Sequence, residues 1–278
     1  MISTVDPRWH SYAAKFELGA RGREVFIKAH FVRHAPDRRS VRLQFRRERA
    51  CLEILAGLAV PELVRARPED MRTLLPPRSS WIAMRRCRGR ALCLSNLSAP
   101  ERIGAWLFLL EQLVAFRRHQ ILYTDVKCWN VLAAARPLSA TVIDFGAAVP
   151  IPRTRTAVFA FSPGFNAPEQ LAGGPVTESA LVFQASVVLG CSLVGLKTHL
   201  LGDPRHGRGA LLARLASSGC GALAPVVRAS LDESPACRPH DFEALFSAVR
   251  GQPVPAAVAD AWSRLREPCR EKLAEVGL

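Results

Sequence analysis

The segment that decides the fold is Tyr123–Gly146, which reads Y-T-D-V-K-C-W-N-V-L-A-A-A-R-P-L-S-A-T-V-I-D-F-G. It contains two short runs of strand-forming residues, Val131–Ala134 and Ala140–Ile143, separated by the proline-containing turn Arg136–Ser139. Two such runs around a short turn predict an antiparallel β-hairpin. The residues just before the first strand and just after the second should therefore lie side by side at its open end.

Polar residues occupy that open end and the loop that enters it. Asn130 comes directly before the first predicted strand, and Asp144 comes directly after the second. Amide and carboxylate oxygens suit Mg²⁺, a hard cation that usually shares its coordination shell with substrate phosphates. Asp125, in the entering loop, could accept a proton from a hydroxyl, and Lys127 could hold a transferring phosphoryl group. The open end of the hairpin thus offers two oxygen ligands, from Asn130 and Asp144, that suit Mg²⁺.

The ordered pair D-V-K-C-W-N and I-D-F-G resembles the catalytic loop and the metal-binding loop of protein kinases. The resemblance implies an α+β, two-lobed protein-kinase-like fold in a single domain, 1–278. It places a small β-rich lobe at about residues 8–84, a mainly helical lobe at 88–250 and an extra helical segment at 251–278. It also implies ATP, with Mg²⁺ or Mn²⁺ as the metal ion.

The resemblance extends upstream to a lysine–glutamate pair. Two β-like runs are predicted at Tyr12–Leu18 and Glu24–Phe31, and the second contains Lys28. Lys28 resembles the strand lysine that binds the α- and β-phosphates of ATP in this family. A helix is predicted over Val41–Leu58, where apolar residues recur at helical spacing. Glu48 lies on that apolar stripe, and an unpaired carboxylate there would be costly, so Lys28 is its expected partner.

The chain departs from the family at the loop that covers the phosphates. Protein kinases carry G-x-G-x-x-G well before the strand lysine, whereas Gly19-Ala20-Arg21-Gly22 is only a fragment and lies close to Lys28. This segment is either a shortened glycine-rich loop or simply the turn between two strands. Phosphate binding by backbone N–H groups of this loop is therefore left open.

Residues 81–92, W-I-A-M-R-R-C-R-G-R-A-L, resemble the hinge between the two kinase lobes. The resemblance places Met84 at the back of an adenine pocket. It assigns the backbone groups of Arg85 through Cys87 to contacts with adenine. An edge strand followed by a turn is the alternative interpretation.

A strongly apolar helix is predicted over Pro100–His119, and it would deliver the catalytic loop at its end. Tyr123 and Thr124 stand where the family commonly has His-Arg. Without that arginine, Asp125 has no basic neighbour that could hold an activation-loop phosphate. Catalysis therefore need not depend on phosphorylation of the loop.

The segment F-S-P-G-F-N-A-P-E, 161–169, resembles the end of a Ser/Thr kinase activation segment. Ser162 takes the position of a hydroxyl that bonds to Asp125 and Lys127. A later segment, D-E-S-P-A-C-R-P, supplies Arg238, which the resemblance pairs with Glu169 in a buried bidentate ion pair beneath the substrate shelf. Small-molecule kinases of related fold generally lack this pair, so it favours a protein substrate.

A long apolar stretch, Ala180–Leu196, contains Gln184 and serine residues, which favours a buried helix over a membrane span. Leu181 stands where the family has an aspartate that anchors the backbone of the catalytic loop, so the rigidity of that loop is left open. The segment Val254–Leu278 is predicted to form one more amphipathic helix.

Composition limits the class of protein. The chain has 278 residues, 49% of them hydrophobic, which excludes a disordered protein. The net charge of +14 predicts attraction to anionic partners such as a nucleotide, an acidic protein, nucleic acid or a charged lipid surface, although basic soluble proteins without such partners are common. We expect protein substrates, acidic ones among them, and no requirement for nucleic acid. The arginine-rich face of the 41–58 helix is a solvated surface or a docking site for an acidic partner.

Cysteine spacing and the N-terminal residues bear on location. The eight cysteines show neither C-x-x-C pairs nor zinc-finger spacing, which predicts scattered buried thiols. The first residues lack the apolar core of a signal peptide. We therefore expect no transmembrane segment and a cytoplasmic or other reducing compartment. For a viral protein or a secreted effector, that compartment would be the host cytoplasm or nucleus. The sequence does not indicate an oligomeric state.

The sequence thus predicts a serine/threonine protein kinase that transfers the γ-phosphoryl group of ATP to protein hydroxyls with Mg²⁺. Asp125 would orient the hydroxyl, Asn130 and Asp144 would hold the metal, and Lys28, held by Glu48, would position ATP. Two alternatives stay open. One is a pseudokinase that acts as a scaffold or regulator, and the other is a kinase for a sugar, an antibiotic or a lipid head group.

Overall fold

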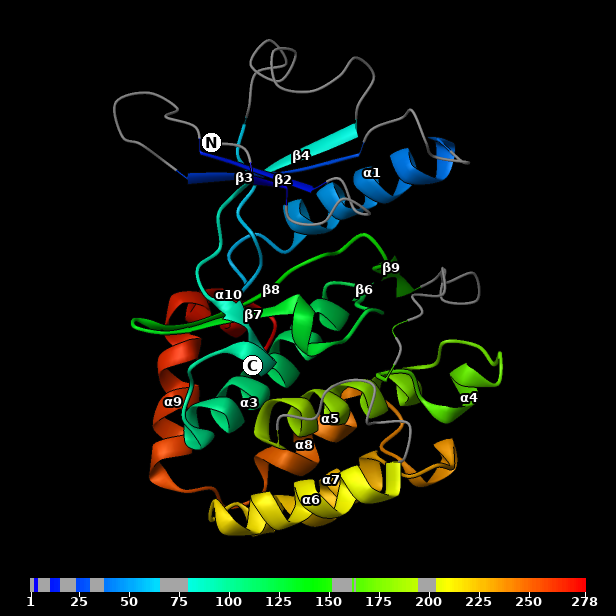
Figure 1. Cartoon of the computed structure of the whole chain (residues 1–278), viewed down its shortest axis with the longest axis vertical. Coiled ribbons are helices and arrows are strands. Elements are labelled where there is room, and N and C mark those ends of the chain that lie inside the picture. Colours follow the sequence, from blue (N-terminus) through cyan, green and yellow to red (C-terminus); the bar gives the residue numbers. More distant parts are fainter. Residues whose placement is uncertain are drawn as a thin grey trace.

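The structure, a computed structural model, describes residues 3–4, 11–15, 24–30, 38–65, 80–151, 162, 164–194 and 204–278. Within these residues the protein is an α+β structure in which helices predominate over small antiparallel sheets. Figure 1 shows the larger sheet at one end of the molecule and most of the helices at the other.

The larger sheet has the strand order β1-β2-β3-β4, and helix α1 packs beside it (Figure 1). These elements are β1 Ser3–Thr4, β2 Ser11–Lys15, β3 Glu24–His30, α1 Arg38–Ile54 and β4 Ser80–Arg85. Along β3, the buried Val25, Ile27 and Ala29 alternate with the half-buried Phe26 and Lys28. Because side chains of a strand alternate between its two faces, Lys28 lies on the face opposite to the three buried residues.

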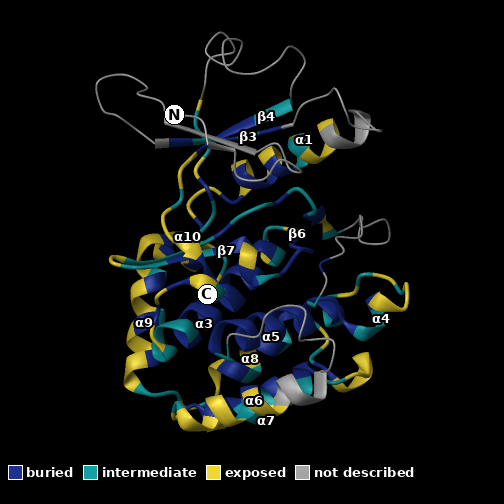
Figure 2. Ribbon diagram, in the orientation of Figure 1, coloured by how far each residue is buried: buried dark blue, intermediate teal, exposed yellow. Residues whose placement is uncertain are grey.

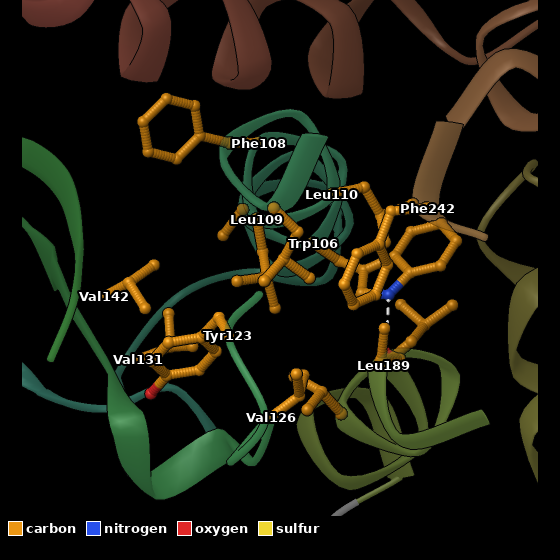
Figure 3. Packing of buried hydrophobic residues seen from close by; sticks show 14 of the residues in the cluster. Trp106, Phe108, Leu109, Leu110, Tyr123, Val126, Val131, Val142, Leu189 and Phe242 are labelled. Carbon is orange, nitrogen blue, oxygen red and sulfur yellow. Dashed lines mark hydrogen bonds between the residues drawn. The ribbon is translucent and has the colours of Figure 1, made fainter. Parts of the chain in front are cut away.

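The helical part is built around two long helices, α3 Ala99–Arg118 and α5 Glu178–Val194. Both are buried over most of their length, which explains why their sequences are apolar all round (Figure 2). The ring N–H of Trp106 on α3 donates a hydrogen bond to the carbonyl oxygen of Ala185 on α5 at 2.8 Å (Figure 3). The packing between these two helices therefore forms the centre of the core.

Shorter helices surround this pair and show an exposed side (Figure 2). The α-helices are α4 Pro168–Leu171, α6 Pro204–Ser217, α7 Ala224–Ser230, α8 Phe242–Arg250, α9 Ala256–Arg266 and α10 Arg270–Glu275. The 3-10 helices are η1 Leu92–Leu94, η2 Cys128–Asn130, η5 Gly221–Leu223, η6 Pro235–Cys237 and η7 Glu267–Cys269. Hydrophobic residues of these elements, apart from α4 and η6, extend the same core.

The predicted hairpin is confirmed as β7 Val131–Ala135 and β8 Leu138–Val142. The strands are antiparallel, with Val131 opposite Val142, and the backbone N–H of Ile143 donates to the carbonyl oxygen of Asn130 at 2.9 Å. Strand β5, Arg90–Ala91, pairs with β7 on its other side. A second small pairing joins β6, Ile121–Leu122, to β9, Val149–Pro150. These pairings hold both ends of the loop that carries Asp125.

The predicted helix over 100–119 is confirmed with a shift of one residue at each end. This helix, α3, starts at Ala99 because Ser98 caps it. The two residues form a capping box, in which the side chains of Ser98 and Glu101 each accept a hydrogen bond from the other's backbone N–H. The helix predicted over 41–58 ends earlier, at Ile54. Gly57, with φ of +91°, turns the chain there in a conformation that glycine favours.

The C-terminal prediction is wrong in one respect. Instead of one helix over 254–278, α9 and α10 are separated by η7, where Pro268 lacks the N–H group that a continuous helix needs. Helix α9 packs against α3. A Cβ atom added to Gly104 of α3 would lie 2.8 Å from the Cβ of Ala261, so the two helix backbones approach closely. The segment after 251 is thus an integral part of the core around α3.

Two further predictions concern the segment 19–22 and a membrane-spanning helix. The glycine-containing segment 19–22 lies outside the described residues, so its role stays a prediction. Among the helices of the described ranges, none is both long enough and apolar enough to span a membrane.

Candidate active site

Three charged side chains from distant parts of the chain meet where the sheet faces the helical part. The Nζ atom of Lys28, on β3, lies 2.8 Å from Oε2 of Glu48 on α1 and 2.7 Å from Oδ1 of Asp144, just after β8. The side chain of Glu48 is 3% exposed and that of Asp144 is 43% exposed. The expected contact between Lys28 and Glu48 is therefore present, and Asp144 completes a cluster of one cation and two carboxylates.

Burial and the attraction between opposite charges shift the pKa values of these three groups in opposite directions. Burial alone would lower the pKa of Lys28, but the two carboxylates outweigh burial and raise it well above its usual range. Burial raises the pKa of Glu48, and attraction to Lys28 only partly offsets this. Burial also disfavours the charged form of Asp144, yet Lys28 keeps the pKa of this carboxyl below its ordinary value. Lys28 is thus positively charged. Of its two carboxylate partners, Asp144 is the one whose charged form is favoured relative to its ordinary pKa, and Glu48 is the one whose charged form is disfavoured.

The backbone around Asp144 is unusual. Asp144 has φ of +64°, a left-handed conformation that few residues other than glycine, asparagine and aspartate adopt. The following Phe145 is fully buried and packs against Tyr123 and Phe116, with ring centroids 5.0 and 5.4 Å away. A Cβ atom on Gly146 would lie 3.3 Å from Oδ1 of Asp144. The buried ring and the small glycine therefore allow the carboxylate to turn toward Lys28.

A second polar cluster is formed by the loop before β7. The Nζ atom of Lys127 lies 2.6 Å from Oδ2 of Asp125, and Asn130 donates from Nδ2 to the same Oδ2 at 3.0 Å. The hydroxyl of Ser162 donates to Oδ1 of Asp125 at 2.7 Å and accepts from Lys127 at 3.3 Å. The structure therefore brings the predicted residues Asp125, Lys127, Asn130 and Ser162 into one hydrogen-bonded group. It also shows that Asp125 can accept a hydrogen bond from a hydroxyl.

Tyr123 and Thr124 tie this loop to the segment that carries Asp144. The Tyr123 hydroxyl donates to the carbonyl oxygen of Ile143 at 2.6 Å, and the Thr124 hydroxyl donates to that of Ala147 at 2.7 Å. Tyr123 is buried, and burial raises its pKa well above the usual range, so its phenol stays a neutral donor. Figure 3 shows Tyr123 next to Val131 among the buried hydrophobic residues. Tyr123 and Thr124 thus hold the loop against the segment that carries Asp144.

The residues at the open end of the hairpin fit the expected metal ion in their chemistry. The amide nitrogen of Asn130 points to Asp125, so its oxygen points away from that carboxylate. The carboxylate of Asp144 is half-exposed. Within the described ranges, no group of three or more histidine, cysteine, aspartate or glutamate residues could form a metal site. Two protein oxygens suit Mg²⁺, because this ion keeps several waters and binds substrate phosphates rather than requiring a cage of protein ligands.

The residues predicted to form the hinge lie at the end of β4 and directly after it. Met84, on β4, is 5% exposed and pairs with Phe26 of β3. The N–H of Arg85 donates to the carbonyl oxygen of Glu62 at 2.7 Å, so this donor is not available to adenine. Cys87 follows the strand and is half-buried, with Sγ 3.8 Å from the carbonyl oxygen of Arg85. The assignment of adenine contacts to the backbone of 85–87 must therefore exclude the Arg85 N–H.

Gln184 is a positioning residue that the sequence analysis missed. Leu181 is fully buried and apolar, but the backbone of the loop that carries Asp125 has another anchor. Oε1 of Gln184 accepts the N–H of Val126 at 3.2 Å, and its Nε2 donates to Oε1 of Gln170 at 3.0 Å. The signal was present in the sequence, since an amide inside an apolar helix needs buried partners. Residue type alone did not show which backbone group it would meet.

The expected pair of Glu169 and Arg238 is present. The two guanidinium nitrogens of Arg238 lie 2.7 and 3.0 Å from the two carboxylate oxygens of Glu169. This bidentate contact joins α4 to the residue that follows η6. Its part in a substrate shelf stays a prediction.

No protein-family model matches the chain, and no curated protein shows significant similarity to it. The chemistry of the site must therefore be judged from its geometry. The predicted residues form two neighbouring polar clusters, one around Lys28 and one around Asp125, and the short hairpin β7–β8 connects them.

Proposed function

We propose that the chain is a protein-kinase-like phosphotransferase with a two-lobed fold, which transfers the γ-phosphoryl group of ATP to serine or threonine hydroxyls of proteins. The observation that carries this proposal is the Lys28–Glu48–Asp144 cluster beside the Asp125–Lys127–Asn130 group. The first cluster suits a charged nucleotide and a metal ion. The second suits an acceptor hydroxyl.

Each residue has a distinct role in the proposed reaction. Lys28, which is cationic and held by Glu48, binds phosphate oxygens of the nucleotide. Asp125 orients the acceptor hydroxyl and takes its proton, as its bond with the Ser162 hydroxyl illustrates. Lys127 places a positive charge beside the same carboxylate, where it can stabilise charge on the transferred group. Mg²⁺ held by Asn130 and Asp144 would neutralise phosphate charge.

A protein acceptor is favoured over a small molecule by two contacts. The Ser162 hydroxyl lies in the Asp125 group, and it belongs to the same segment as Glu169, which Arg238 fixes. The segment that ends at α4 is thus tied both to the site and to the helical part. Such a supported segment suits the binding of an extended polypeptide next to Asp125.

A test compares phosphoryl transfer from γ-labelled ATP to the acidic protein casein by the wild type and by Asp125→Asn, Lys28→Met and Asp144→Asn. Each substitution should lower transfer by about 10²-fold or more, because each removes a charge that acts on the reacting groups. Asp260→Asn is the matched control, since Asp260 is an exposed aspartate that forms a surface pair with Arg264, and it should transfer at the wild-type rate. Equal rates for Asp125→Asn and the wild type would exclude the proposed reaction.

A second candidate is a scaffold of the same fold that does not transfer phosphate. It is favoured by the direct contact of Asp144 with Lys28, because this contact must open for the nucleotide and the metal ion to enter between them. Calorimetric titration of ATP with and without Mg²⁺ separates the two. The phosphotransferase should bind ATP more tightly with Mg²⁺, whereas equal affinity would favour the scaffold.

A further inference from the structure

Three of the eight cysteines come together beside the proposed catalytic loop. The sulfur of Cys93, in η1, lies 2.8 Å from the sulfur of Cys128, in η2. The thiol of Cys128 also interacts with that of Cys191 on α5. All three are free thiols, and η1, η2 and α5 contact one another. The eight cysteines are free thiols, as the sequence analysis expected, but these three lie together rather than scattered.

The junction is held by a guanidinium group that bonds to backbone carbonyls. Arg102 donates to the carbonyl oxygens of Leu92 and Ser95, on either side of Cys93, at 3.5 and 2.6 Å. It also donates to that of Ser192, the neighbour of Cys191 on α5. Arg102 thus fixes η1 on α5 and holds the sulfur of Cys93 against Cys128. The contact between the two sulfurs is a consequence of this arrangement and does not depend on the flexibility of a surface loop.

The three thiols differ in access to solvent. Cys128 and Cys191 are 1% and 0% exposed, whereas Cys93 is half-buried. A small oxidant can therefore reach Cys93 first, and the nearest second thiol is that of Cys128. Cys128 lies between Lys127 and Asn130, both of which bond to Asp125.

We propose that Cys93 and Cys128 form a disulfide bond when the protein meets a peroxide, and that this bond displaces the loop that carries Asp125. The second part deepens the proposed function, because it makes phosphoryl transfer sensitive to oxidation. In the first step the sulfur of Cys93 loses its proton and attacks the peroxide, the O–O bond breaks, and a sulfenic acid and water form. In the second, the sulfur of Cys128 attacks that of Cys93, the S–O bond breaks, and a second water leaves. Two thiols are oxidised, and one peroxide is reduced to two waters.

The surroundings of Cys93 disfavour its thiolate form. The hydrogen bond with Cys128 and burial raise the pKa of Cys93, while the guanidinium of Arg102 opposes this shift. Because the thiolate is the reactive form, this thiol reacts more slowly than activated cysteines.

Formation of the bond would move the loop. A disulfide requires a sulfur separation of about 2.05 Å and a fixed dihedral angle, so the two backbones must adjust. Since Arg102 fixes η1, most of the adjustment falls on η2. A displacement of about 1 Å in reacting groups can lower a rate by about 10²-fold.

The test uses the purified full chain, treated with hydrogen peroxide and mapped as non-reduced peptides by mass spectrometry. We expect a Cys93–Cys128 cross-link in the wild type and in the control Cys220→Ser, which removes a buried thiol outside the junction. Cys93→Ser should show no such cross-link. A wild type that gives no cross-link, or that joins Cys128 to Cys191 instead, would overturn the proposal. This readout does not depend on enzymatic activity.

A second measurement follows the loop itself. On oxidation, backbone hydrogen exchange of the peptide that contains residues 125–130 should change in the wild type and in Cys220→Ser, and dithiothreitol should reverse the change. Where phosphoryl transfer is measured, it should fall at least about tenfold in the same two proteins and stay constant in Cys93→Ser. Unchanged exchange in a cross-linked protein would refute the displacement of the loop. An inactive reduced protein would refute the proposed function but leave the cross-link as a separate result.

Discussion

Arg238 and Glu169 form a bidentate ion pair although they stand 69 positions apart in the sequence, with N–O distances of 2.7 and 3.0 Å. The side chain of Arg238 is fully buried, whereas that of Glu169 is 21% exposed. Arg238 also donates to the carbonyl oxygens of Asp232 and Glu233, and its guanidinium lies 4.9 Å from the ring centroid of Phe183. The arginine therefore joins three segments of the helical part.

The first prediction concerns the stability of this pair. Arg238→Ala and Glu169→Ala should each lower the free energy of unfolding by about 3–5 kcal/mol, because each leaves a charge without its partner in a poorly solvated place. Since both substitutions remove the same contact, the double variant should cost at least about 1 kcal/mol less than the sum of the two. Denaturant unfolding of the four proteins measures this coupling.

The exposed pair of Arg264 and Asp260 provides the control. Both side chains are more than half exposed, so Arg264→Ala should cost no more than about 0.5 kcal/mol. If the losses of unfolding free energy in Arg238→Ala and Glu169→Ala simply add in the double variant, the two residues do not interact in solution. The supported segment before α4 would then lack its proposed anchor.

The contact of Glu169 with Arg238 was predictable because each residue belongs to a short sequence motif that resembles one of the kinase motifs. The hairpin β7–β8 was predictable for the same reason, since its strands and turn are local in sequence. The contact of Asp144 with Lys28 was not predicted. It depends on the left-handed backbone of Asp144 and on how the sheet lies over the helical part, and neither is encoded in a local pattern.

Gln184 gives the second prediction. Its amide links the N–H of Val126, next to Asp125, to Gln170, whose Oε1 also accepts the N–H of Ala167 at 2.8 Å. Gln184→Met keeps the volume of the side chain but leaves buried polar groups without partners. It should therefore cost about 1–3 kcal/mol in unfolding free energy and loosen the catalytic loop.

Hydrogen exchange of the Val126 N–H measures the second effect, and we expect faster exchange in Gln184→Met. Gln252→Met is the matched control, because Gln252 is only partly buried and donates to the nearby Ala248 carbonyl within the end of α8. It should leave the exchange of Val126 unchanged. Equal protection of Val126 in Gln184→Met and the wild type would show that the loop has another anchor.

The third prediction separates backbone strain from steric clash at two glycines. Gly89, between β4 and β5, has φ of +103°, and a Cβ atom there would lie 2.4 Å from the carbonyl oxygen of Ala133. Gly173 has a similar φ of +82°, but a Cβ atom would meet nothing within 4 Å. Gly173→Ala should cost about 1–2 kcal/mol from backbone strain alone. Gly89→Ala should cost clearly more, because the backbone of β7 must also move.

Thermal unfolding of the two variants checks this difference. Equal losses of stability in Gly89→Ala and Gly173→Ala would mean that the chain near Gly89 can move away from β7 without an energetic cost. Such an outcome would also weaken the assignment of 85–87 to a fixed hinge. The sequence analysis did not single out Gly89, because its close approach to β7 involves residues more than forty positions away.

Asp144 gives the last prediction, which concerns pH. The pKa of this carboxyl is lowered from its ordinary value of 3.8, with Lys28 as the main favourable cause against burial. A carboxyl with a lowered pKa stabilises the folded state above its ordinary pKa, and this contribution is lost as the pH falls through the folded value. The raised pKa of Lys28 acts at the other limit, since the lysine contributes below its ordinary value of 10.5 and loses this contribution only as the pH rises further. The attraction between the two groups should therefore be complete from about pH 5 to about pH 10.

Melting curves of the wild type and of Asp144→Asn over pH 2–8 test this reasoning. Because Asp144 is 43% exposed, solvent screens the contact, and we expect the variant to melt only about 1–3 °C lower at pH 7. The difference should shrink below pH 4 and vanish near pH 2, where both proteins carry a neutral group at this position. Asp260→Asn, at an exposed pair, should show little difference at any pH. A difference for Asp144→Asn that persists unchanged at pH 2 would show that the carboxylate stabilises the fold by shape or hydrogen bonding, and that its charge does not contribute through Lys28.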